Sequence, residues 1–64
     1  MKAYIYHVET NQIAVVILGD NNKDIEREIQ YQNYDTDVFG VTYSQHGLHT
    51  MYDTEFVDVT GSYE

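Results

Sequence analysis

The hydrophobic positions of the first 18 residues follow the pattern of two β-strands. Residues 2–8 alternate, so that one face carries Tyr4, Tyr6 and Val8 and the other carries Ala3, Ile5 and His7. The four polar residues at 9–12 predict a hairpin loop. Residues 13–18 are continuously apolar, which is typical of a central strand covered on both faces. We therefore expect residues 13–18 to be the core strand.

A helix is predicted over residues 23–34. Asn21 can cap its N-terminus, because a side-chain oxygen at this position accepts a hydrogen bond from the first turn, and Asp24 follows as in a weak capping box. Ile25 and Ile29 lie four residues apart on one side of the helix and form a narrow apolar stripe. This stripe predicts docking on the sheet, with Val15 and Ile17 buried against Ile29.

Further strands are predicted in the second half of the chain. Residues 38–44 alternate, residues 45–47 indicate a turn, and residues 48–60 indicate one long strand or two short ones. Short connections favour antiparallel pairing. The sequence thus predicts a single α+β domain over residues 1–64, in the order ββαββ. One helix would pack on a face of a small antiparallel sheet of four to five strands.

The charge of the chain is strongly acidic and unevenly distributed. Eleven Asp and Glu residues face three Lys and Arg residues, for a formal net charge of −8. All three bases lie at or before Arg27, whereas the seven acids from Glu28 onward have no base among them. A field of this sign disfavours direct binding to nucleic acid or to an anionic membrane, and it favours a basic protein surface as partner. An acidic surface can also serve solubility alone.

The composition also bears on location and cofactors. The chain has no cysteine, so a disulfide framework and a thiolate metal site are both excluded. The apolar run at 13–18 is far shorter than the roughly 20 residues that span a bilayer, and no secretory signal pattern is present. We expect a cytoplasmic protein without cofactor or metal.

No catalytic arrangement is predicted. Ser44, His46 and Asp53 include the groups of a hydrolase triad, but no glycine-framed turn surrounds the serine. His46 and His49 beside Asp53 could hold a divalent metal, yet no third ligand has a diagnostic spacing. The four glycines are scattered, so no phosphate-binding loop is indicated. We therefore expect a protein that is not an enzyme.

Carboxylates next to tyrosines suit an arginine-rich partner, because the ring can stack on a guanidinium group while the carboxylate accepts its hydrogen bonds. On a regular strand Asp53 and Glu55 would project from one face about 6.6 Å apart, and such a line of charge can imitate backbone phosphates. The predicted partner-binding residues are Glu28, Tyr31, Tyr34, Asp35, Asp37, Tyr52, Asp53, Glu55 and Asp58.

In its size, lack of cysteine, ββαββ-like layout and acidic second half, the chain resembles the small acidic anti-CRISPR proteins of phages and mobile elements. The acids that carry this resemblance are Glu28, Asp35, Asp37, Asp53, Glu55 and Asp58. Some anti-CRISPR proteins are DNA mimics, while others block nuclease recruitment or act as enzymes. The resemblance implies an inhibitor that occupies the DNA-binding or PAM-reading surface of a CRISPR effector subunit, with type I surveillance complexes as the first candidates.

Other functions fit the same pattern. Small acidic phage inhibitors of restriction enzymes or of host DNA-binding proteins share these features. A regulatory or structural interaction module, such as an antitoxin or an assembly subunit, would use a free sheet edge and carry its acids as solubilising cover. A metal-dependent enzyme using His46 and His49 is the third alternative. Acids gathered on one face favour mimicry, whereas an even distribution favours the module.

Overall fold

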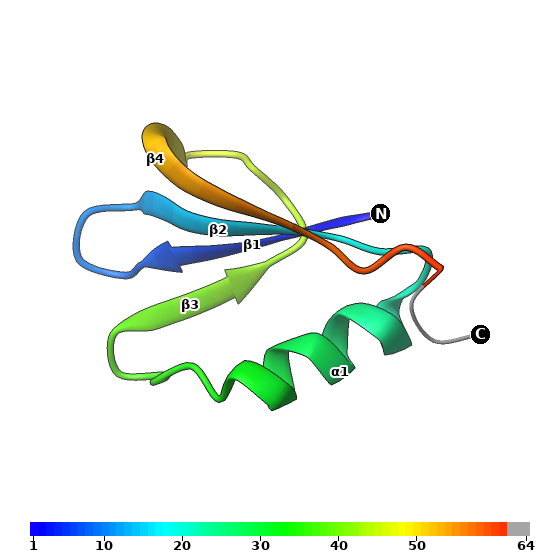
Figure 1. Cartoon of the computed structure of the whole chain (residues 1–64). Coiled ribbons are helices and arrows are strands. Elements are labelled where there is room, and N and C mark those ends of the chain that lie inside the picture. The colour runs from blue at the N-terminus through cyan, green and yellow to red at the C-terminus, as the bar shows by residue number, and fades with distance from the viewer. Residues whose placement is uncertain (62–64) are drawn as a thin grey trace.

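The computed structural model describes residues 1–61, so residues 62–64 of the predicted domain lie outside the described residues. The elements follow the chain as β1 (Lys2–His7), β2 (Gln12–Leu18), α1 (Asn22–Gln32), β3 (Phe39–Thr42) and β4 (His49–Asp58), as Figure 1 shows. One helix and one four-stranded sheet place the chain in the predicted α+β class.

The sheet is mixed, and the prediction of a purely antiparallel sheet is therefore wrong. Its strand order is β3-β1-β2-β4, with β1 antiparallel to both β2 and β3 and with β4 parallel to β2. The turn predicted at residues 45–47 does form, since the Leu48 N–H donates to the Gln45 carbonyl at 3.0 Å. It does not return the chain to β3, however, because residues 43–48 run from β3 at one edge to β4 at the other (Figure 1). A short connection alone thus did not determine the strand direction.

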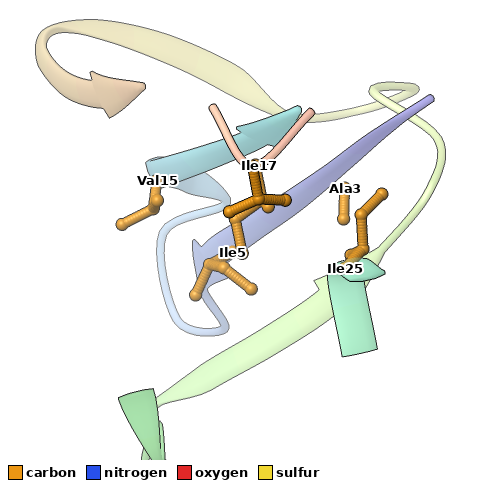
Figure 2. Close-up of a cluster of buried hydrophobic side chains, with 6 residues drawn as sticks. Ala3, Ile5, Val15, Ile17 and Ile25 are labelled. Carbon is orange, nitrogen blue, oxygen red and sulfur yellow. The ribbon is translucent and has the colours of Figure 1, made fainter. Parts of the chain in front are cut away.

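The hydrophobic core lies between α1 and one face of the sheet. Cross-strand pairing of Ala3 with Ile17 and of Ile5 with Val15 places these side chains on the helix face. Ala3 and Ile5 thus share one face of β1, as predicted. The cluster comprises Ala3, Ile5, Val15, Ile17, Ile25 and Val59, and Figure 2 shows Ile25 of α1 beside the side chains of β1 and β2. Ile29 packs against the cluster that contains Val15 and Ile17, as predicted, but it is only partly buried. Ile25, one turn earlier, is fully buried, so the helix docks chiefly through Ile25.

The ends of α1 are fixed by local hydrogen bonds. The predicted cap is confirmed, because Asn21 Oδ1 accepts from the Asp24 N–H at 3.0 Å. At the other end Asn33 adopts a left-handed conformation with φ 54°, and its N–H donates to the Ile29 carbonyl at 3.0 Å. The helix therefore ends two residues before Tyr34, which is free to pack against the sheet.

The sheet face away from α1 carries Tyr4, Tyr6, Val16 and Phe56. Tyr4 pairs with Val16, which in turn lies opposite Phe56 on β4. Gly40 of β3 pairs with Tyr6, and a Cβ atom at Gly40 would lie 2.5 Å from Cζ of the Tyr6 ring. The ring therefore covers the glycine, and a side chain at this point of β3 would require the Tyr6 ring to shift.

Candidate acidic binding cleft

The pairing of β4 with β2 is interrupted by a bulge, residues 51–54. Thr50 lies opposite Ile13, but the next pair joins Glu55 to Val15, so β4 contains three residues more than β2 over this interval. Buried Thr54 closes the bulge. Its hydroxyl donates to the Ile13 carbonyl at 2.7 Å and accepts from the Met51 N–H at 2.9 Å. The remaining bulge residues are exposed, and Tyr52 is 100% exposed.

Two clefts that share His7 and Gln12 lie where β1 ends and β2 begins. The larger, of about 350 Å³, is lined by His7, Gln12, Ile13, Ala14, Val15, Met51, Tyr52, Asp53 and Glu55. The smaller, of about 260 Å³, is lined by His7, Glu9, Thr10, Gln12, Asp37 and Val38. We call the two together the His7 cleft. Four carboxylates line it, and among the described residues its lining includes no Lys or Arg. The His7 cleft is therefore a concave surface of one charge sign.

An aromatic row connects the end of α1 to the His7 cleft. The ring of Tyr34 meets Phe39 edge-on at 5.9 Å, and Phe39 lies 4.9 Å from the His7 ring. The pKa of Tyr34 is raised, first because the phenol is partly buried and then because Glu28 and Glu55 repel its ionised form. Glu28 is also held by a hydrogen bond from Gln32 Nε2 to its Oε1 at 3.0 Å. The charges of Glu28 and Glu55 thus act on one tyrosine from two different elements.

The structure brings four of the nine predicted binding residues into the His7 cleft and links two more to Glu55 or to each other electrostatically. Asp37, Tyr52, Asp53 and Glu55 line it. Tyr34 and Glu28 interact electrostatically with each other, and Tyr34 does so with Glu55. Because Asp53 belongs to the bulge and Glu55 follows it, the spacing of a regular strand does not apply to this pair. The line of charge expected from the sequence is replaced by two acids on the wall of one cleft.

The other three predicted residues have different surroundings. Asp35 shapes the turn before β3, where its Oδ1 accepts from the Asp37 N–H at 2.9 Å. Tyr31 is 80% exposed on α1. Asp58 pairs with Leu18, at the end of β2 opposite to Gln12, so it lies away from the His7 cleft. Hydrogen bonds from the side chain and backbone of Thr60 lower the pKa of Asp58.

Sequence reasoning missed His7, Glu9 and Gln12 as cleft residues. The alternation of β1 correctly placed His7 on the face of Ala3 and Ile5, but it did not show that this face continues past the core. The available signal was a polar residue at the last position of an apolar alternation, followed closely by an acid. Such a residue is typical of the point where a core face reaches solvent.

The histidines of the second half do not form a metal site in the described part of the chain. Among residues 1–61, no three His, Asp or Glu side chains are grouped so that they could hold a metal ion. Ser44 has a local role, because its hydroxyl accepts from the backbone N–H of His46 at 3.3 Å. Within the same residues, no helix has the length and apolar character needed to cross a bilayer.

No protein-family model, curated protein or solved structure matches this chain. Its function is therefore inferred from the shape and charge of the His7 cleft.

Proposed function

We propose that this protein is a non-catalytic inhibitor that binds a basic, DNA-handling protein surface through the His7 cleft. The observation that carries this proposal is the placement of Glu9, Asp37, Asp53 and Glu55 on two adjoining clefts whose lining, among the described residues, includes no Lys or Arg. Converging carboxylates raise the local concentration of cationic groups and steer their approach. A surface that neutralises DNA phosphates with Lys and Arg is complementary to such a cleft.

The two lysines lie at the end of the sheet opposite to the His7 cleft. Lys2 pairs with Leu18, and Lys23 lies in the first turn of α1, which follows the same end of β2. The His7 cleft lies at the opposite end, around Gln12. This separation leaves the acids of the His7 cleft without a lysine beside them and supports an oriented encounter with a basic partner.

Exposed aromatic groups would complement the carboxylates. Tyr52 is fully exposed next to Asp53 on the wall of the larger cleft. An incoming arginine could stack on the Tyr52 ring while its guanidinium group donates to a carboxylate. The partner implied by the resemblance is a CRISPR effector subunit, which this inhibitor would meet in the cytoplasm of a bacterial host. The contact would block recognition of DNA or of the PAM.

The experiment is a competition assay with a purified type I surveillance complex and its labelled target duplex. The protein should displace the duplex, and the displacement should weaken steeply as salt is raised. The double variant Asp53→Lys with Glu55→Lys should weaken inhibition by roughly tenfold or more, because two close charge pairs are reversed.

The matched control is Asp20→Lys with Glu26→Lys, which makes the same charge change at exposed acids that do not line the His7 cleft. This control should retain most of the inhibition, and melting curves should show that both variants are folded. Inhibition that does not change with salt concentration, or that falls equally in the two double variants, would contradict recognition by the cleft. Failure to displace DNA from any such complex would reject this partner.

The outer edge of β4 favours a second candidate, an interaction module that resembles an antitoxin or assembly subunit and binds by strand addition. β4 is an edge strand of the sheet in the described part of the chain. In that case the protein would bind its partner whether or not the partner handles DNA.

A further inference from the structure

The part of β4 that follows the bulge is a regular edge strand. Glu55 to Asp58 lie opposite Val15 to Leu18 in unbroken parallel register, and the next N–H, that of Val59, donates to the Leu18 carbonyl at 2.8 Å. In a parallel ladder every second residue bonds to a given neighbour. Glu55, Val57 and Val59 therefore use their backbone groups toward β2. The backbone N–H and C=O groups of Phe56 and Asp58 point to the outer edge.

The opposite edge of the sheet is less suited to strand addition. β3 has four residues, and the N–H of Val8 donates to the Val38 carbonyl, so the alternation directs Phe39 and Val41 outward. The Phe39 N–H already donates to the Asp35 carbonyl at 2.8 Å. The outer edge of β3 thus has fewer donors to offer than residues 55–58 of β4.

We infer that residues 55–58 of β4 accept an extended segment of the basic partner, which joins the sheet as a further strand beyond β4. This inference rests on the proposed function, which supplies a basic partner. Side chains of adjacent strands lie about 4.8 Å apart on each face, so the segment must complement β4 residue by residue. Lys or Arg would lie beside Glu55 and Asp58, and apolar residues beside Phe56 and Val57.

The recognised motif is therefore basic–apolar–apolar–basic. Glu55 and Val57 project on the α1 face and Phe56 and Asp58 on the other, so the segment presents one basic and one apolar residue to each face. Phe56 is 65% exposed and provides the larger apolar contact. Because the motif reads the same in both directions, it suits parallel and antiparallel addition alike.

Charge excludes a second copy of this chain as the occupant of the edge. Two β4 strands side by side would bring Glu55 and Asp58 of one copy close to the same acids of the other. Directly opposed like charges destabilise a strand pair, and each copy has a formal net charge of −8. A basic segment gains from the same acids that repel a second copy.

The test uses the peptide acetyl-Thr-Arg-Val-Val-Arg-Thr-amide as the probe. Its control is the same peptide with both valine nitrogens methylated, which keeps the two charges but removes two backbone donors. Binding is followed by amide chemical shifts and hydrogen exchange of the whole chain. The unmodified peptide should bind roughly fivefold more tightly than its control, because only one of two adjacent valine N–H groups can face β4 and one hydrogen bond is therefore at stake. It should also slow exchange of the Phe56 and Asp58 amides.

A pair of variants tests the edge from the side of the protein. Phe56→Ala removes the aromatic contact, whereas Phe56→Pro also removes the outward N–H and leaves the bonds from Glu55 and Val57 to β2 in place. The proline variant should bind the unmodified peptide roughly fivefold more weakly than the alanine variant does, since one further hydrogen bond is lost. Melting curves establish that both variants are folded.

The outcomes separate this inference from the proposed function. Equal binding of the two peptides, or protection at the His7 cleft without protection at Phe56 and Asp58, would overturn strand addition and leave the acidic cleft as the binding surface. Absence of peptide binding would also overturn it, while the competition assay with the folded DNA-handling complex decides the proposed function independently. Self-association through β4, seen as protection of Phe56 in concentrated protein alone, would replace the basic segment by a second copy.

Discussion

Replacement of Thr54 by valine should destabilise the protein through the loss of one hydroxyl group. Thr54 is buried and its hydroxyl makes two hydrogen bonds, to the Ile13 carbonyl at 2.7 Å and from the Met51 N–H at 2.9 Å. Valine has nearly the same shape but can neither donate nor accept. Because the β2–β4 pairing is interrupted between Ile13 and Val15, no regular ladder partner from β4 replaces the lost donor.

The size of the destabilisation follows from the hydrogen bond that each partner of Thr54 loses. The Ile13 carbonyl becomes a buried acceptor without a partner, while the N–H of exposed Met51 can turn to water, so the loss should be about 2 to 4 kcal/mol. A domain of this size has a total stability of about 3 to 10 kcal/mol. Thr54→Ser keeps the hydroxyl and loses one methyl group, which costs about 1 kcal/mol. The valine variant should therefore be clearly less stable than the serine variant.

Urea unfolding followed by circular dichroism measures the difference. With a slope of about 1 kcal/mol per molar urea, the valine variant should unfold roughly 2 to 4 M earlier than the parent. Hydrogen exchange provides a local readout, since the Met51 amide should exchange faster in Thr54→Val than in Thr54→Ser. If Thr54→Val is as stable as the parent, or if serine costs as much as valine, the hydroxyl does not hold the bulge.

Three further predictions concern the core, the second face and Tyr34. Ile25→Ala should lower the free energy of unfolding by about 2 to 5 kcal/mol and leave the protein largely unfolded in circular dichroism. Ile29→Ala should lower it less, because Ile29 is only partly buried. The reverse order would mean that α1 docks mainly through Ile29. Gly40→Ala should cost about 1 to 3 kcal/mol in urea unfolding, because its Cβ would lie 2.5 Å from the Tyr6 ring, and an unchanged midpoint would show that the ring moves aside freely. Because the pKa of Tyr34 is raised above 10.0 in the folded state, the unfolded chain releases this proton first, so stability should fall as the pH rises past about 10. Tyr34→Phe should reduce that fall above about pH 10, and an identical fall in both proteins would assign it to other groups.

The local elements were predictable because short-range signals determine them. The alternation from Ala3 to His7 gave the correct faces of β1, and Asn21 caps α1 as its side chain predicts. The direction of β4 was not predictable from the same signals. A connection of six residues can return the chain as a hairpin beside β3 or carry it across the sheet to β2. The outcome depends on the position at which Val57 and Val59 reach the core.

The candidate site was predicted in its chemistry but not in its geometry. Tyr52, Asp53 and Glu55 were identified because they belong to the half of the chain whose acids have no compensating base, and they do line the larger cleft. His7 and Gln12 join them only through the pairing of β1, β2 and β4, which sequence spacing does not contain. The placement of Asp58 beside Leu18, away from the cleft, depends on the same register. The sheet topology must therefore be known before the cleft residues that lie far apart in the sequence can be identified.

The bulge explains why core, cleft and free edge occur together on one strand. If pairing had continued without interruption from Thr50 opposite Ile13, Tyr52 would lie opposite Val15 and Thr54 opposite Ile17. An odd number of inserted residues exchanges the two faces of a strand. The three extra residues instead bring Val57 opposite Ile17, where it packs against the core, and they bring Val59 into it. The same insertion displaces Tyr52 and Asp53 outward to the cleft. Regular pairing with β2 resumes at Glu55 and continues to Asp58, where β4 ends. The buried hydroxyl of Thr54 stabilises this exchange, so a change that loosens the bulge should disturb the core register and the acidic cleft together.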